Sequence, residues 1–149
     1  MCYNFYIDFW RNKLKDIKSD KFASVIARIL DDKQAKDIKI LNISNISVLA
    51  DYFVICSSDS PTHVKALTGY VREKVKDCFE RIPIGEENDT RNRWNLLDYG
   101  DVIVHVLHKE ERETYALERF WNHAFCMEET EWKEKSKEYS VYSDSKKEV

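Results

Sequence analysis

Two aspartates in this sequence have the type and spacing of acid–base or metal chemistry. Asp98 and Asp101 are three residues apart, and two carboxylates so placed can hold a divalent cation or share a proton. They also flank Tyr99-Gly100, and Asp and Gly are the residues that a tight β-hairpin turn requires. Because no third carboxylate is evident nearby, we favour the hairpin and predict no metal site here.

Two histidines close to this pair are a second candidate for metal binding. His105 and His108 are three apart, and on a strand such residues point to opposite faces of the sheet. A single ion cannot be shared by both without a bulge. We therefore expect a surface or partner-facing role for His105.

A serine-rich turn and a cysteine are the remaining candidates for chemistry. Residues 57–60, Ser-Ser-Asp-Ser, precede Pro61, and a helix N-terminus there can bind phosphate through backbone amides. The turn lacks a glycine-rich loop and a Lys-Ser/Thr pair, and Asp59 repels anions, so helix capping explains it. Cys56 with His63 resembles a nucleophile and base, but a cysteine in an apolar strand is usually inert. We predict no catalytic residues, no cofactor and no bound metal.

The elements that position these residues follow from hydrophobic periodicity. Apolar residues from Phe22 to Leu30 recur with helical spacing, which predicts a helix capped by Ser19 or Asp20 that ends near 32–36. Residues 37–43 and 52–57 are predicted strands. Ser60 and Pro61 start a helix that stops before Pro83. Gly69 inside that helix is costly, and a close backbone contact would explain it.

The second half of the chain repeats this alternation. Residues 84–92 are a predicted polar loop, residues 94–99 and 101–108 are predicted strands, and residues 110–122 are a predicted helix. The order of helices and strands indicates an α/β fold in a single domain, with a mixed β-sheet flanked by helices.

The two ends differ from this central domain. We assign residues 1–18 to an aromatic N-terminal extension with helical spacing and residues 19–123 to the domain. Residues 124–149 are a charged tail with few aliphatic side chains, predicted to be disordered. On that basis, deletion of residues 127–149 should leave the fold nearly intact.

Composition excludes several classes of protein. The 149 residues are 43% hydrophobic with a net charge of −3, which fits a folded domain and argues against nucleic-acid binding by bulk charge. The sequence contains no apolar run long enough for a membrane span and no signal-peptide pattern at its start. The four cysteines form no Cys-x-x-Cys pair, which favours reduced thiols and a cytoplasmic location.

Strand parity brings one mixed group of side chains to a single face. With alternation on each strand, that face contains Trp94, Leu96, Asp98, Asp101, Ile103 and His105. If helices cover the other face, this combination is typical of a protein-binding patch with Trp94 as its anchor. The equally open alternative is that Trp94 is a core residue.

Three blocks of this sequence resemble the Iojap family, the ribosomal silencing factors (RsfS). They lie in order within residues 22–122. The blocks are Asp51-Tyr52-Phe53-Val54-Ile55, the serine-rich turn before His63-Val64-Lys65-Ala66, and the run from Trp94-Asn95-Leu96-Leu97-Asp98-Tyr99-Gly100-Asp101 to Phe120-Trp121.

The resemblance implies both a fold and a function. The fold is similar in outline to that of nucleotidyltransferases, without their activity. Family members bind the large ribosomal subunit at its protein fourteen (L-fourteen), block joining of the small subunit and repress translation under nutrient limitation. Carried over by position, the partner-binding residues are Trp94, Leu97, Asp98, Tyr99, Asp101 and His105, although parity puts Leu97 and Tyr99 on the other face from Trp94.

The same resemblance sets the other expectations. We expect a translation repressor that is not an enzyme, that has no membrane or sequence-specific nucleic-acid partner, and for which a homodimer is allowed. The alternative function is a nucleotidyltransferase-like nucleotide-processing enzyme. Such an enzyme needs clustered carboxylates for Mg²⁺ beside the turn at residues 57–60.

Overall fold

The helices and strands alternate as the hydrophobic pattern predicts, with two additions near the ends of the sheet. The computed structural model describes residues 17–140, without the side chain of Phe120. The elements are α2 (Ser19–Asp32), β1 (Lys36–Asn42), β2 (Tyr52–Ser58), α3 (Pro61–Phe79), β3 (Gly85–Asn88), β4 (Trp94–Asp98), β5 (Val102–His108), α4 (Lys109–Tyr115), α5 (Leu117–Phe120), β6 (Phe125–Cys126) and α6 (Glu129–Lys135).

The strands form one six-stranded mixed sheet in the order β3-β4-β5-β2-β1-β6. The central pair, β2 and β5, is parallel, and all other neighbours are antiparallel. The chain passes from β2 to β5 through α3 and the β3-β4 hairpin. The α/β fold class with a mixed sheet is therefore confirmed.

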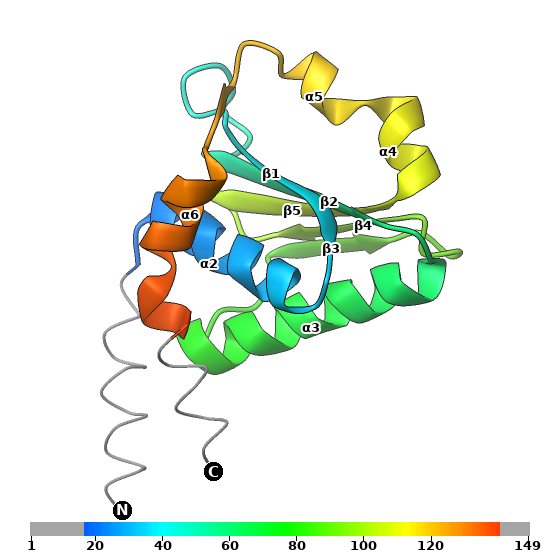
Figure 1. The fold of residues 1–149 in the computed structure, drawn as a ribbon, viewed down its shortest axis with the longest axis horizontal. Helices are drawn as coiled ribbons and strands as arrows, with labels where there is room; N and C mark the ends of the chain where they lie inside the picture. The colour runs from blue at the N-terminus through cyan, green and yellow to red at the C-terminus, as the bar shows by residue number, and fades with distance from the viewer. Residues whose placement is uncertain (1–16, 141–149) are drawn as a thin grey trace, which may run out of the picture.

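Helices cover the two faces of the sheet unequally (Figure 1). The long helices α2 and α3 lie on one side, with α6 beside α2, and the short helices α4 and α5 lie on the other. We call the first side the helix-covered face and the other side the second face. The main core lies under the helix-covered face, and a smaller cluster around Phe53, Ile55 and Leu107 lies under the second face.

The start of α2 differs slightly from the prediction. Lys18 holds the N-cap position and makes no side-chain capping bond, whereas Ser19 and Asp20 lie inside the first turn. Ser19 Oγ donates to Asp101 Oδ2 at 3.0 Å, and Asp20 accepts from Lys135 Nζ at 2.8 Å. These polar residues therefore link α2 to neighbouring elements instead of capping it.

The predicted cap of α3 is present in the structure, but the predicted close contact at Gly69 is not. Ser60 Oγ accepts the backbone N–H of His63, and Pro61 is the first helical residue, so the predicted cap is confirmed. The predicted close backbone contact at Gly69 is wrong. A Cβ placed there would meet Arg72 Nη2 at 3.7 Å, an ordinary van der Waals distance.

Two local features were missed because neither has a hydrophobic pattern. The predicted loop 84–92 contains the edge strand β3, whose residues Gly-Glu-Glu-Asn pair antiparallel with β4 and are largely exposed. The predicted helix 110–122 is broken at Ala116, which has a φ of 43° and separates α4 from α5. A left-handed alanine has no recognisable sequence signal.

The predicted disordered tail from residue 124 is wrong for the described part. Cys126 and Phe125 extend the sheet beside β1, and α6 packs on α2. Trp132 is 3% exposed and Tyr139 is 1% exposed, and both belong to the main core. The low average hydrophobicity of this segment hides these few large side chains. The rest of the tail, 141–149, and the helix considered for residues 1–16 lie outside the described residues.

Candidate functional site

The six residues that sequence reasoning assigned to a partner surface divide into three groups. Trp94 and His105 are brought together on the second face. Leu96 is the register partner of His105, so Trp94, two residues before it on β4, is the diagonal neighbour of His105. The indole Nε1–H of Trp94 donates to His105 Nδ1 at 3.2 Å. The predicted parity of Trp94, Leu96, Ile103 and His105 is confirmed.

Leu97 and Tyr99 lie inside the core of the helix-covered face. Leu97 is 0% exposed, and the Tyr99 ring packs edge-to-face on Phe22 with centroids 5.4 Å apart. No bulge near Gly100 brings either side chain to the second face. Both side chains are buried away from the second face, so a partner-binding role for them stays a prediction that would have to act through the position of β4.

Asp98 and Asp101 form the hairpin between β4 and β5. Asp98 Oδ1 accepts the N–H of Gly100 at 2.8 Å, and Gly100 has a φ of 92°, which only glycine adopts readily. Asp101 pairs with Arg81 at 2.8 Å. The predicted hairpin is confirmed. Since Asp98 is four residues from Trp94 along β4, this turn lies about 13 Å from Trp94.

We define the Trp94 surface as Trp94, Leu96, His105 and Tyr115. Trp94 is partly exposed, and its ring lies 5.0 Å from that of Tyr115, which is 49% exposed at the end of α4. Beneath them, Phe53 contacts His105 with ring centroids 4.8 Å apart and Trp121 with centroids 5.2 Å apart. A continuous layer of aromatic rings therefore supports an aromatic surface that reaches solvent.

His105 lies buried beneath the Trp94 surface, so the expectation of a surface histidine is wrong. Its side chain is 5% exposed, and burial lowers the pKa of its imidazole to about 4, so the ring is neutral near pH 7. Because Nδ1 accepts from Trp94, the ring proton resides on Nε2, which has no hydrogen-bond partner. An unpaired buried donor costs about 1–3 kcal/mol. The Trp94 surface therefore rests on a buried N–H group that has no hydrogen-bond partner.

Sequence reasoning missed the aromatic residues that complete this surface. The sequence predicts Tyr115 inside a continuous helix. In the structure α4 ends at Tyr115, because the chain breaks at Ala116, and the Tyr115 ring lies beside Trp94. Phe53 had a usable signal, because it alternates with Val54 and shares its face with Ile55. That alternation was concealed by the uniformly apolar run of β2.

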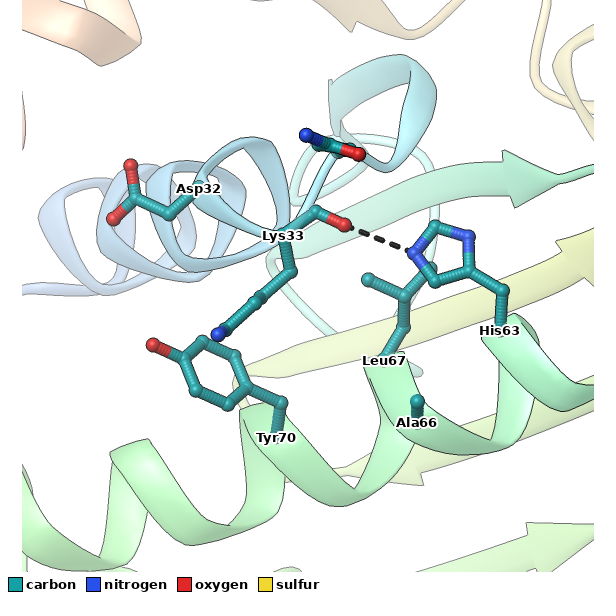
Figure 2. Close-up of a pocket in the computed structure, with 7 residues that line it drawn as sticks. Asp32, Lys33, His63, Ala66, Leu67 and Tyr70 are labelled. Carbon is teal, nitrogen blue, oxygen red and sulfur yellow. Dashed lines mark hydrogen bonds between the residues drawn. The ribbon is translucent and has the colours of Figure 1, made fainter.

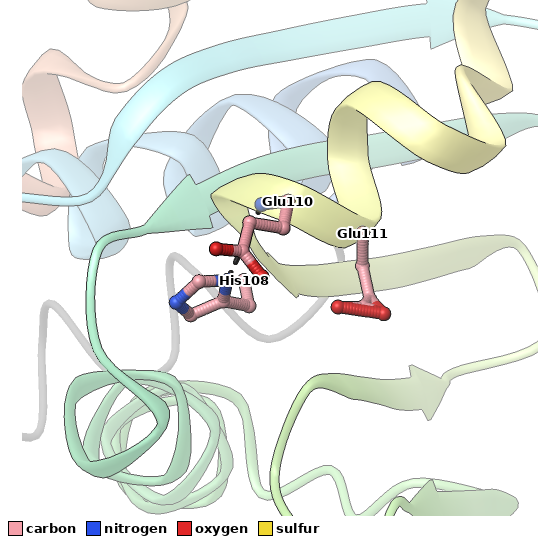
Figure 3. A group of neighbouring side chains, drawn as sticks. All are labelled: His108, Glu110 and Glu111. Carbon is pink, nitrogen blue, oxygen red and sulfur yellow. Dashed lines mark hydrogen bonds between the residues drawn. The ribbon is translucent and has the colours of Figure 1, made fainter.

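Within residues 17–140, one group of histidine and acidic side chains has the proximity of metal ligands (Figure 3). Single ligand atoms of His108, Glu110 and Glu111 lie within 4.8 Å of one another. Arg93 already pairs with both glutamates at 2.6 Å, which lowers the pKa of the Glu110 carboxyl. His108 Nδ1 accepts the N–H of Glu110. The arrangement is a guanidinium–carboxylate cluster that fixes the start of α4.

The serine-rich turn is occupied by internal contacts. His63 Nδ1 accepts from Ser58 Oγ at 2.6 Å, and its Nε2 lies 2.9 Å from the Lys33 carbonyl. Asp59 forms an ion pair with Lys36, whose hydrogen bond lowers the pKa of the carboxyl. Burial raises the pKa of the Cys56 thiol to about 12. These contacts give His63 and the turn a structural role, and the Cys56 thiol stays protonated.

Comparison with known proteins identifies relatives of this chain. The family model "Ribosomal silencing factor during starvation" (RsfS) matches residues 16–149. The ribosomal silencing factor RsfS of Bacillus subtilis is 40% identical over 100 residues, which cover 67% of this chain and 84% of that protein. The RsfS of Halalkalibacterium halodurans is 34% identical over 113 residues, covering 75% of this chain and 95% of that protein.

A solved structure gives the same result for the fold. A crystal structure of a protein from Chromobacterium violaceum superposes with a TM-score of 0.68 at 30% identity and covers 71% of this chain and 88% of that one. The fold and the sequence therefore define a ribosome-associated α/β domain. This chain belongs to the ribosomal silencing factor (RsfS) family, whose relatives include the Iojap proteins.

Proposed function

We propose that this protein binds the large ribosomal subunit through its protein fourteen and thereby prevents the small subunit from joining. Family membership supports an action on ribosomes, and the family description links that action to starvation. Occupation of a subunit interface would lower translation when nutrients are scarce. The protein would act in the cytoplasm, where ribosomes work.

The Trp94 surface is the observation that carries this proposal. Interface hot spots are enriched in tryptophan, tyrosine and arginine that sit on well-packed surroundings. Trp94 and Tyr115 fit this description, because both rings reach solvent while His105, Phe53 and Trp121 support them from below. A rigid aromatic pair loses little conformational entropy when a partner covers it.

The electrostatics suit a basic partner. The chain has a net charge of −3, so its balance is acidic, although Arg93 pairs with Glu110 and Glu111 at the start of α4. An acidic binder is steered toward a basic ribosomal protein and repelled by ribosomal RNA phosphate. This charge pattern favours a protein contact on the subunit over an RNA contact.

The remaining residues of the predicted set would act by positioning. Leu97 and Tyr99 anchor β4 in the helix-covered core, on the opposite face from Trp94. Asp98 shapes the hairpin, while Asp101 ties it to Arg81 and Ser19. We propose that these four residues fix the orientation of the β4-β5 hairpin, that Trp94 belongs to the contact itself, and that the buried His105 supports Trp94 from below.

Sedimentation with separated ribosomal subunits tests the proposal. The protein should travel with the large subunit and not with the small one. Added before the subunits are mixed, it should reduce the fraction of joined ribosomes. Purified protein fourteen added in excess should release it. Sedimentation with the small subunit alone, or no loss of joined ribosomes at saturating protein, would refute the proposal.

We further propose that no reaction is catalysed, because steric occlusion requires no catalytic group. The nucleotidyltransferase-like alternative needs Mg²⁺ carboxylates near the turn at residues 57–60, where Asp59 is held by Lys36. Calorimetry with Mg²⁺ and ATP should give no binding heat. Binding at micromolar concentration would favour the enzyme. Whether the protein forms a homodimer stays a prediction for sedimentation equilibrium.

A further inference from the structure

A groove runs along the outer side of α3, far from the Trp94 surface. A hollow of about 460 Å³ lies between the end of α2 and α3, where Lys33 and Tyr70 face each other (Figure 2). A second hollow of about 660 Å³ continues beside the later turns of α3. Both are lined by Ala66 and Tyr70, so they form one continuous groove.

The far end of this groove is apolar and exposed. Ile82 is 68% exposed and, with Pro83, lines the second hollow, and Ile84 is 76% exposed two residues on. Gly69 lies in the floor, where a Cβ would have room but none is present. Arg72 and Lys76 also line the hollow, and such side chains stack favourably on aromatic rings. The groove therefore suits an aromatic, extended or helical segment.

The described chain begins at this end of the groove. Ser19 Oγ is 3.0 Å from Asp101 Oδ2, and the other oxygen of Asp101 is 2.8 Å from Arg81 Nη2. Arg81 directly precedes Ile82. The first described residues, Ile17 to Ser19, consequently lie a short distance from the apolar rim.

The residues before Ile17 are rich in aromatic side chains, which suit an apolar groove. Residues 1–16 include Tyr3, Phe5, Tyr6, Phe9 and Trp10. Fully extended they span about 55 Å, and α3, with 19 residues, is about 28 Å long. The segment is therefore long enough to follow the whole groove. The family match begins at residue 16, so residues 1–15 are an addition to the shared domain.

We propose that the aromatic N-terminal segment, residues 1–16, docks in this groove of its own chain, with its rings against Ile82, Pro83 and the floor at Gly69. Docking would cover apolar surface that is otherwise exposed to water. The C-terminal residues 141–149 are a poorer occupant, because they contain one aromatic residue, Tyr142, among mostly polar ones.

Limited trypsin digestion of the full chain, followed by intact-mass spectrometry, tests the docking. The segment offers Arg11, Lys13 and Lys15 as cleavage sites. Cleavage there should be slower than in a free peptide of residues 1–16 by roughly tenfold or more, since cleavage of a docked segment follows the population of its open form. The protection should be independent of protein concentration.

Two variants release the segment in different ways. Ile82→Asp places a charge on the rim, and Gly69→Leu fills the floor while favouring the helix; both should restore cleavage to the rate of the free peptide. Val48→Asp is the matched control, since Val48 is an exposed apolar residue on the loop after β1. It should leave the protection unchanged.

Three results would overturn the proposal. Cleavage of the wild-type segment at the rate of the free peptide would show that nothing protects it. Protection that survives in both groove variants would place the segment elsewhere. Protection that disappears on dilution would assign the groove, or the segment, to a second copy of the chain.

Discussion

The two faces of the sheet differ in how completely helices cover them. Under α2, α3 and α6, large apolar side chains are almost fully buried, and long helices cover them. On the second face, two short helices leave Trp94 and Tyr115 partly exposed, and His105 Nε2 is buried without a partner. Arg112 Nη1, from α4, is also buried without a hydrogen-bond partner, as is Tyr99 OH under the helix-covered face, so the faces differ in helix coverage and not in unpaired polar atoms. One face buries most of the core, and the other exposes the Trp94 surface, where we propose that the partner binds.

This difference is expected to separate the effects of mutations. A substitution under the helix-covered face should lower the free energy of unfolding without any special effect on binding. A substitution on the second face should lower binding more than stability. The predictions below test that separation, beginning with the largest effect.

Trp132→Ala should destabilise the protein by about 3–5 kcal/mol, because it empties a buried site between α6 and the main core. Deletion of residues 127–149 should be at least as harmful, contrary to what the composition of the tail indicated. Urea denaturation followed by circular dichroism measures both. A truncated protein with the wild-type midpoint would show that α6 contributes nothing to this face.

Leu97→Ala and Leu96→Ala compare the two faces at adjacent positions of β4. Leu97 is fully buried under the helix-covered face, so its truncation should cost about 2–5 kcal/mol. Leu96 is partly exposed on the second face and should cost clearly less. Equal losses of unfolding free energy in the two variants would contradict the asymmetry.

His105 should make stability depend on pH. Its folded pKa of about 4 is below the 6.5 of a free histidine. Between these values the unfolded chain binds a proton that the folded chain does not. Stability should therefore fall as pH drops from 6.5 toward 4, by up to about 1.4 kcal/mol per pH unit.

His105→Gln should flatten this part of the pH profile and retain an acceptor for Trp94. The matched control is His123→Gln, at an exposed histidine, which should keep the wild-type slope. Thermal melts across the pH range make the comparison. An unchanged slope in His105→Gln would mean that the imidazole titrates normally in the folded protein.

Gly69→Ala should raise stability by about 0.5–1 kcal/mol, the smallest effect in this series. The added Cβ meets no atom closer than 3.7 Å, and alanine favours the helix over glycine by this amount. Denaturant titration gives the difference. A loss of stability would reveal a close packing partner for α3 at this position.

Periodicity was sufficient to predict most of the framework. The stripes of α2 and α3 and the parity of β4 and β5 depend on repeating apolar residues, which is why Trp94 and His105 were correctly placed on one face. The same parity predicts Leu97 and Tyr99 on the other face, whereas the family resemblance grouped them with Trp94. The structure places both under the helix-covered face, as parity predicts.

Features determined by single residues could not be predicted in this way. The break at Ala116 requires a backbone conformation that alanine rarely adopts, and it decides where Tyr115 lies. The ordering of α6 depends mainly on Trp132 and Tyr139, which an average over a charged tail does not register. The unpaired Nε2 of His105 arises from tertiary packing alone.

The most direct test of the account is the affinity of Trp94→Ala for the large ribosomal subunit, measured together with its thermal melt. As a partly exposed anchor, Trp94 should contribute about 2 kcal/mol or more to binding, and its removal should leave the protein folded. Val48→Ala, at an exposed apolar residue outside the Trp94 surface, should bind normally. A folded Trp94→Ala protein that binds the large subunit as tightly as the wild type would contradict the account.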